Sequence, residues 1–170
     1  MTETQHDSET LAEGQQVFTA CAFIWREENG VKQVFLARRA DTKKFLPGAW
    51  ELPGGHIDYG EDMREGLARE VMEELGMHVE IGEVLDVFTY MNEVKKCHSI
   101  EVIYFAQFTD LLESIRLHPE DHSTFGWFAL DELEQTYACP KDAADPEVAT
   151  IRKGFARLEI LQEPIPNLIP

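Results

Sequence analysis

The residues best suited to chemistry in this sequence are three glutamates, Glu70, Glu73 and Glu74. In a helix, positions 70 and 74 are one turn apart and position 73 lies between them on the same side, so the three carboxylates can converge. Like charges at these spacings destabilise a helix by roughly 0.2–0.5 kcal/mol per pair, and hard divalent cations with oxygen ligands are the natural compensation. The pattern therefore indicates a metal site, with a solvated acidic helix face as the plainer alternative. Arg69 can pair with Glu73 at i,i+4 and orient its carboxylate.

The segment that carries these glutamates, residues 62–75, has the period of a helix. It ends at Gly76, a residue suited to the left-handed position just after a helix. At about 100° per residue, the apolar side chains fall on one side and the glutamates on another. The apolar set is Leu67, Ala68, Val71, Met72 and Leu75. We expect a helix with an apolar back and an acidic front.

Strand-like segments lie on both sides of this helix. Residues 16–26 and 32–39 are apolar and β-prone and enclose turn residues at 28–30, which predicts a hairpin. Residues 50–52 form a short extended segment, stopped by Pro53, Gly54 and Gly55. The other expected elements are strands at 78–90, 100–108 and 125–129 and helices at 131–137 and 146–161. This order predicts an α/β fold in which a mixed β-sheet lies between helices.

Length and composition fit one globular domain. The chain of 170 residues can bury one core but is too short for two ordinary domains. Its 44% hydrophobic and 28% charged residues are close to globular averages, and no apolar run is long enough to span a bilayer. We expect a flexible N-terminal tail at 1–14, a single domain at 15–162 and a C-terminal tail at 163–170.

Charge and cysteine usage limit the partners and the compartment. The formal net charge of −17 repels the phosphate backbone of DNA and RNA, so a polymeric nucleic acid partner is not expected. A phosphorylated small molecule is repelled as well, unless divalent cations bridge it to the carboxylates. The three cysteines lack CxxC spacing, and residues 1–14 have neither the basic start nor the apolar stretch of a signal peptide. We therefore expect a cytoplasmic protein without a membrane partner.

A longer pattern surrounds the three glutamates. Residues 55–77 contain Gly55, Glu61, Arg69, Glu70, Glu73, Glu74 and Gly76 in the spacing GX5EX7REUXEEXGU. This segment resembles the Nudix box, with Met77 as a mild departure at the last apolar position. Residues 48–55, Gly-Ala-Trp-Glu-Leu-Pro-Gly-Gly, resemble the family's usual approach to the box, and the likeness extends over about 18–133.

The resemblance implies a fold, a reaction and a metal set. Nudix hydrolases are α/β/α sandwiches that cleave a nucleoside diphosphate linked to another group, with Mg²⁺ or Mn²⁺ as cofactor. By this likeness Glu70, Glu73 and Glu74 would bind the metal, aided by a backbone carbonyl of the Gly54–Gly55 loop, taken here as Gly55. Glu61 and Arg69 would orient this cluster.

Further residues are candidates for catalysis or substrate binding. The base that activates water would be Glu70 or Glu73, or a carboxylate from the loop at 119–122, for which Glu120 is the candidate; a solvated loop acid is the alternative. His56 could reach a substrate phosphate. Arg38 and Arg39 should point to opposite faces of a strand, so at most one should point into a cleft.

Other side chains are expected to have plainer roles. Trp25, Trp50 and Trp127 could stack on a base, but core packing is the commoner role of tryptophan in β-like segments. His98 and Glu101 flank a strand and could contact substrate, although solvent exposure is the expectation.

The substrate is a nucleotide-like small molecule whose identity the sequence narrows only by elimination. The residues near Tyr90 lack the proline typical of ADP-ribose hydrolases in this family, and Tyr90 lies slightly short of the tyrosine of the dinucleoside-polyphosphate group. A nucleoside triphosphate or modified dNTP is therefore the leading class, with ADP-ribose or a nucleotide sugar as the alternative. A Nudix-fold regulator that binds nucleotide without hydrolysis is a rival hypothesis, and a homodimer is left open.

Overall fold

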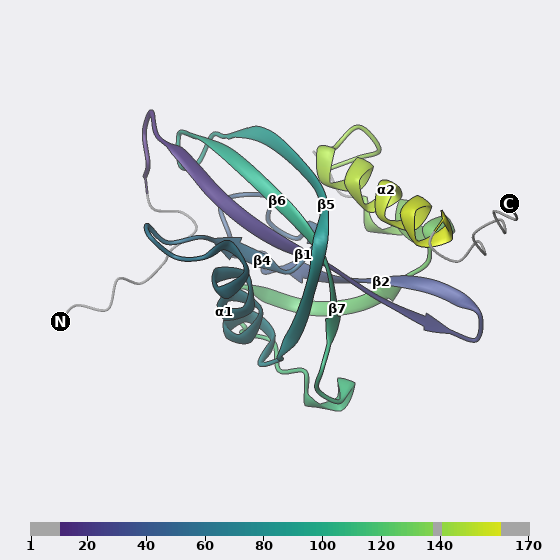
Figure 1. Ribbon diagram of the computed structural model, residues 1–170. Coiled ribbons are helices and arrows are strands. Elements are labelled where there is room, and N and C mark those ends of the chain that lie inside the picture. Colours follow the sequence, from purple (N-terminus) through teal and green to yellow (C-terminus); the bar gives the residue numbers. More distant parts are fainter. Residues whose placement is uncertain (1–10, 138–140, 161–170) are drawn as a thin grey trace, which may run out of the picture.

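In the computed structural model, which describes residues 11–137 and 141–160, a seven-stranded mixed sheet lies between two helices (Figure 1). The helices are α1 (Met63–Leu75) and α2 (Pro146–Ile160). The strands are β1 (Gln16–Glu28), β2 (Val31–Arg39), β3 (Trp50–Glu51), β4 (Gly54–His56), β5 (Val79–Asn92), β6 (Cys97–Phe108) and β7 (His122–Phe128), and two 3-10 helices are η1 (Leu112–Ser114) and η2 (Leu130–Thr136). The predicted α/β class with a mixed sheet between helices is confirmed.

Strand β1 links the two halves of the sheet. Its residues 16–24 pair in parallel with β6, its residues 19–21 pair antiparallel with β4, and its residues 25–28 pair antiparallel with β2. The strand order is β3-β2-β1-β6-β5, and β7 adds to β2. The predicted hairpin is confirmed, with Asn29 and Gly30 both at positive φ in its two-residue turn.

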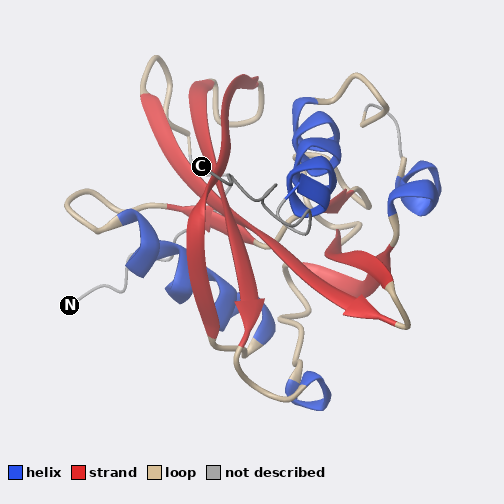
Figure 2. Cartoon of the chain, turned by 45° about the vertical axis from the view of Figure 1, so that its right-hand side comes forward, coloured by secondary structure: helices blue, strands red, loops and turns tan. Residues whose placement is uncertain are grey.

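Alternate residues of β1 face different helices, which explains why the strand is apolar along its whole centre. Ala20, Ala22 and Ile24 pack in a core layer with Leu67 and Val71 of α1. Cys21 and Phe23 pack in a second layer with Ile151, Phe155 and Leu158 of α2. Because helices cover both faces, neither side of the strand needs polar residues. Figure 2 shows the strands running between the two long helices.

Helix α1 begins and ends where its sequence predicts. The Asp62 side chain caps it by accepting from the backbone N–H of Arg64 and Glu65, and Gly76 ends it in the left-handed conformation with φ 64°. Met72, expected on the apolar side, is exposed instead. At 100° per residue it lies about 100° from the centre of the buried stripe, which places it beyond the edge of the core contact.

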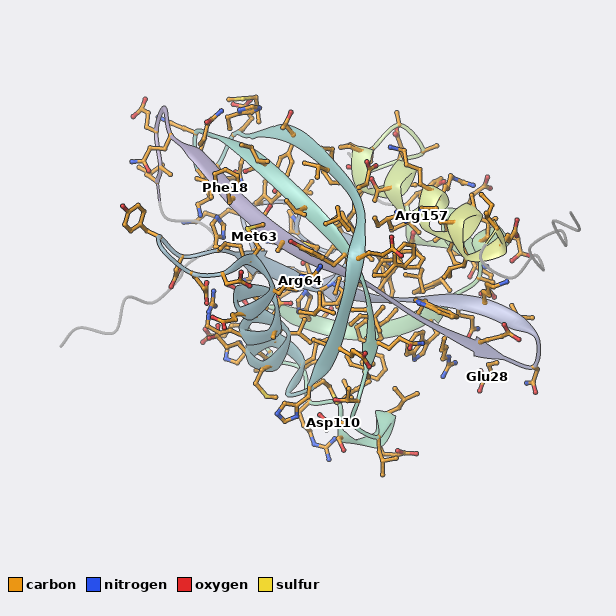
Figure 3. The ribbon with its side chains drawn as sticks, in the orientation of Figure 1. Phe18, Glu28, Met63, Arg64, Asp110 and Arg157 are labelled. Carbon is orange, nitrogen blue, oxygen red and sulfur yellow. The ribbon has the colours of Figure 1, made fainter. Side chains whose placement is uncertain are left out.

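An irregular stretch of β5 connects both helices to the sheet. The register of β5 against β6 shifts between Ile81 and Asp86, which leaves carbonyls outside the regular ladder. Arg64 of α1 donates to the carbonyls of Ile81 and Gly82, and Arg157 of α2 donates to those of Val84 and Leu85. Both arginines are labelled in Figure 3, one on each helix. The bulge thus fixes α1 and α2 relative to the same strand.

The ends of the chain are only partly described. Of the expected N-terminal tail, residues 11–14 are described, and there the backbone N–H groups of Ala12 and Gly14 donate to the carbonyls of Lys95 and Lys96. Residues 1–10 and the expected C-terminal tail at 163–170 lie outside the described residues. In the ranges that are described, no helix combines the length and apolar composition needed to cross a membrane.

Candidate active site

A cleft of about 440 Å³ lies where α1, the segment from β3 to β4, strands β5 and β6 and the start of α2 meet. Its charged lining is strongly acidic. The acidic residues are Glu51, Glu70, Glu73, Glu74, Glu93, Glu101, Asp121, Asp145 and Glu147, and the basic ones are Arg39, Lys43 and Lys141. An anionic ligand would therefore meet net negative charge in this cleft.

The three glutamates of α1 all line this cleft but differ in burial and contacts. Glu70 is nearly buried, and its carboxylate approaches Gly55 so closely that an added Cβ there would lie 2.6 Å from Oε2. Glu74 Oε2 accepts from the backbone N–H of Gly54 at 3.1 Å. The Glu73 side chain is 57% exposed. The cleft is thus lined by one turn of α1 and by the glycine strand β4.

The glycine pair is what lets β4 lie between β1 and α1. Gly54 has φ 141°, and a Cβ at this position would clash with the carbonyl oxygen of Ala20 on β1. Gly55 lies in register with Ala20 and against the Glu70 carboxylate on its other side. Only glycine allows β4 to lie so close to the β1 backbone on one side and to the Glu70 carboxylate on the other.

Arg69 holds the acidic turn of α1 in place. Its Nε and Nη2 donate to the two oxygens of Glu61 at 2.9 and 3.0 Å, and Nη2 also donates to the carbonyl of His56. Its Nη1 donates to Glu70 at 2.9 Å and to Glu73 at 3.4 Å, so the predicted i,i+4 pair is present. The hydrogen bonds that Arg69 donates to Glu61, and then those to Glu70, raise the pKa of Arg69 despite partial burial. The guanidinium is therefore a permanent charge that orients three carboxylates.

The carboxylates of the cleft are not fully compensated by this one arginine. Burial raises the pKa of Glu74 well above its ordinary value, and the negative charges of Glu51 and Glu70 raise it further. Among residues 11–137 and 141–160, no three His, Cys, Asp or Glu side chains gather closely enough to form a metal-binding group as they stand. The donor chemistry nevertheless fits a hard divalent cation, because the glutamates offer oxygen ligands and the bare Gly55 leaves the Glu70 carboxylate room beside the backbone.

A second network of charges lines the same cleft. Arg39 Nη1 donates to both oxygens of Glu51 at 3.0 and 3.1 Å, and His122 Nε2 lies 3.0 Å from Glu51 Oε1. Burial alone would raise the pKa of Glu51, but Arg39 and His122 outweigh it and lower the pKa to about 2. Next to this network, Lys43 Nζ contacts Asp121 at 2.6 Å. These groups form a fixed, mostly ion-paired wall.

The structure brings only some of the predicted substrate contacts to the cleft. Arg39 and His56 line it, and Lys95 Nζ donates to His56 Nε2 at 2.6 Å. Arg38 points to the other face, as alternation predicts, and pairs with Asp41 at 2.9 Å. Glu120 is exposed and is absent from the lining, because the turn at 118–122 directs its neighbour Asp121 inward instead. This position does not support the role predicted for Glu120.

Several lining residues were missed by sequence reasoning. Glu101, expected to be exposed, is 6% exposed, because it faces the layer between the sheet and α2 rather than solvent. The aromatic side chains in the cleft are Phe45, Phe88 and Tyr90. The three tryptophans do not line the cleft. Trp50 packs against Phe128, which agrees with the expected packing role of tryptophan. The alternation of 99, 101, 103 and 105 in β6 is the signal that could have placed Glu101 on the inner face.

Comparison with known proteins places this fold and site in context. A sequence model described as the NUDIX domain matches residues 16–150. The human m7GpppN-mRNA hydrolase NUDT17 is 42% identical over 52 residues, which is 31% of this chain and 16% of the human protein. The nucleoside triphosphatase NudI of Escherichia coli is 35% identical over 60 residues, 35% of this chain and 42% of NudI. The chain thus matches less than half the length of these curated relatives.

Similarity to a solved structure extends over much more of the chain. The crystal structure of the MutT NUDIX hydrolase from Burkholderia pseudomallei aligns with a TM-score of 0.65 and 28% identity. The alignment covers 82% of this chain and 98% of that one.

Proposed function

The chain belongs to the NUDIX family, and from this membership we propose that it is a metal-dependent pyrophosphohydrolase acting on a nucleoside diphosphate derivative. The observation that supports this most strongly is the arrangement of one turn of α1 against the glycine strand. Glu70, Glu73 and Glu74 line one cleft, Glu70 lies against Gly55, and Arg69 holds the carboxylates in position. Hydrolysis of a phosphoanhydride needs such a set of oxygen ligands beside an open cleft.

The proposed cofactor is Mg²⁺ or Mn²⁺, held by Glu70, Glu73 and Glu74 with the backbone carbonyl of Gly55. When bound, a hard divalent cation neutralises pyrophosphate oxygens and acidifies the attacking water. Arg69 keeps Glu70 and Glu73 oriented, since it bonds to both from the same guanidinium nitrogen. The charge imbalance around Glu74 favours this cation, because Glu74 is buried close to two other carboxylates.

The residue proposed to accept the proton of the attacking water is Glu73 rather than Glu70. Arg69 Nη1 is 2.9 Å from Glu70 but 3.4 Å from Glu73, so Glu73 is held less tightly. The Glu73 side chain is also 57% exposed against 12% for Glu70. An oxygen of Glu73 is therefore the more accessible acceptor from water in the open cleft.

The proposed substrate class is a nucleoside triphosphate, including modified dNTPs. Similarity to the nucleoside triphosphatase NudI supports this class. The cleft is lined by aromatic side chains on which a base can pack, and its volume of about 440 Å³ falls in the usual range for small-molecule sites. ADP-ribose and nucleotide sugars are the alternative substrates and belong in the same assay.

A panel of nucleotides tests the proposed function. Wild-type protein is incubated with nucleoside triphosphates, ADP-ribose and nucleotide sugars in Mg²⁺ or Mn²⁺, and the products are identified. Glu74→Gln is expected to lower turnover by on the order of 100-fold or more, because a nearly isosteric amide replaces a charged ligand. Glu65→Gln, an exposed change on the same helix and outside the cleft, is the matched control and should keep wild-type turnover.

Thermal melting separates the proposed enzyme from its rivals. Mg²⁺ should raise the melting temperature of the wild type by mass action and raise that of Glu74→Gln less. Nucleotide binding without turnover across the panel would favour a nucleotide-binding regulator. Normal turnover in Glu74→Gln would remove Glu74 from the metal set.

A further inference from the structure

Glu101 of β6 is the most unusual buried group outside the proposed metal set. It is 6% exposed, lines the cleft and lies in register with Thr19 of β1 on one side and Phe88 of β5 on the other. In the part of the chain that the structure describes, its Oε1 has no hydrogen-bond partner. A buried carboxyl oxygen without a partner is costly, so its position beside a cleft points to a ligand that completes the bond.

The surroundings of Glu101 favour a hydrogen-bond donor from that ligand. The Cys21 thiol hydrogen bonds to the carboxyl, and Lys141 attracts its charge, while Glu147 and Glu51 repel it. Burial first, and Glu147 second, raise the pKa of Glu101 to about 8. Whether the group is ionised or protonated, a carboxyl oxygen can accept, whereas it can donate only when the single proton resides on it. The negative potential of Glu147 and Glu51 favours electropositive N–H groups at this position.

The wall beside Glu101 is aromatic, and two of its rings stack on each other. The rings of Phe45 and Tyr90 are nearly parallel, with centroids 6.0 Å apart and an interplanar angle of 13°. Phe88 lies next to Tyr90, and the charge of Glu101 acts on the Tyr90 hydroxyl strongly enough to help raise its pKa, after burial. A heterocycle stacked on such rings gains about 1–3 kcal/mol without regard to its identity. Stacking therefore supplies affinity, and the edge of the ring must be read by a polar group.

We propose that Glu101 is a specificity-determining residue that accepts a hydrogen bond, through Oε1, from the exocyclic amino group of a base that packs on the aromatic wall of Phe45, Phe88 and Tyr90. This inference rests on the proposed function, because the phosphates of the same nucleotide would lie at the Gly54–Gly55 end of the cleft. The expected ligands carry adenine or cytosine. Bases with an oxo group at the corresponding position, such as hypoxanthine or uracil, leave the oxygen without its bond.

Pairs of nucleotides that differ by amino or oxo test the proposal. The ratios of kcat/KM for ATP over ITP and for CTP over UTP are measured on wild type, Glu101→Leu, Glu101→Gln and Glu93→Gln. At least one ratio should be on the order of 10 in the wild type, since one hydrogen bond of about 1.4 kcal/mol is a tenfold effect. That ratio should fall to about 1 in Glu101→Leu and stay above 1 in Glu101→Gln, which keeps an acceptor oxygen. Glu93→Gln removes an exposed carboxylate of the same cleft and should leave the ratio unchanged.

A binding measurement distinguishes failure of this inference from failure of the proposed function. Calorimetry with AMP, IMP, CMP and UMP in Mg²⁺ needs no turnover, because the cation can bridge the phosphate to the carboxylates and a monophosphate has no anhydride bond to cleave. If the wild type hydrolyses nucleotides but shows no amino preference, or if the preference survives Glu101→Leu, the role of Glu101 is overturned while the hydrolase stands. If nothing is hydrolysed, a preference for AMP over IMP or for CMP over UMP that disappears in Glu101→Leu still supports the role of Glu101. Equal binding of the two members of each pair overturns that role.

Discussion

Substituting Gly55 by alanine tests whether the position of the Glu70 carboxylate matters for the proposed reaction. A Cβ at Gly55 would lie 2.6 Å from Glu70 Oε2 and 2.8 Å from Cδ, whereas an ordinary carbon–oxygen contact is about 3.3 Å. The carboxylate must therefore move by about 0.7 Å. Gly55 is not at positive φ, so alanine is compatible with its backbone and the effect comes from this contact. Because the displaced atoms are the far end of a flexible side chain rather than backbone, the cost in stability should be small.

The expected effect on catalysis is larger than the effect on folding. A misplacement of about 1 Å in a reacting site can cost about 100-fold in rate, so Gly55→Ala should lower kcat by roughly 10- to 100-fold. The assay is steady-state hydrolysis of the best nucleotide in Mg²⁺, with a thermal melt on the same preparation. Gly82→Ala is the matched control, because its Cβ would lie 3.2 Å from the Phe105 carbonyl on β6, away from the cleft. A folded Gly55→Ala enzyme with the rate of Gly82→Ala would refute the reasoning.

Two further predictions concern the groups that hold the cleft. Arg69→Lys keeps the charge but loses the paired hydrogen bonds to Glu61. It should therefore lower the free energy of unfolding by about 1–3 kcal/mol, measured by urea denaturation, and should lower kcat. Unchanged values of both quantities would contradict the positioning role of Arg69. Glu51→Gln leaves Arg39 buried without its carboxylate and should cost about 3–5 kcal/mol at neutral pH. In the folded protein the pKa of Glu51 is lowered from 4.5 to about 2. The ionised carboxylate therefore stabilises the fold by about 3 kcal/mol above pH 4.5. This contribution is lost as the pH falls from 4.5 through 2. The gap in unfolding free energy between wild type and Glu51→Gln should therefore narrow over that window, and a constant gap would refute the assignment.

Local patterns in the sequence predicted the elements that carry the family pattern. Helix α1 follows from Asp62 as a cap, the apolar stripe and Gly76 as a stop, all of which act within a few residues. The β1–β2 hairpin follows in the same way from its turn at Asn29 and Gly30. The segment predicted as helical at 131–137 is helical, as the 3-10 helix η2. Because β1 is buried on both faces, the sequence shows this strand only as a long apolar run.

The wall of the cleft opposite α1 depends on pairings distant in sequence. Tyr90 reaches Phe45 through the position of β5 beside β6, and no local pattern links residues so far apart. Glu101 is polar and was expected to be solvated, but parallel pairing of β6 with β1 puts it opposite Thr19 on an inner face. Asp121, not Glu120, lines the cleft because a one-residue difference in a turn reverses the direction of a side chain. Such placements follow from sheet topology, which composition and spacing do not specify.

The charge pattern of the cleft separates the two tasks that a nucleotide hydrolase must perform. The basic groups in its lining are engaged with carboxylates: Arg39 with Glu51, Lys43 with Asp121 and Lys141 with Glu147. Each pair nearly cancels its own field, so these cations can offer hydrogen bonds but little net attraction to a triphosphate. On the proposed function, neutralisation of the phosphates would fall to divalent cations at the α1 glutamates, whereas stacking and the proposed Glu101 contact would need no cation. Phosphate binding would then depend on the metal, and base selection would depend on the fold alone.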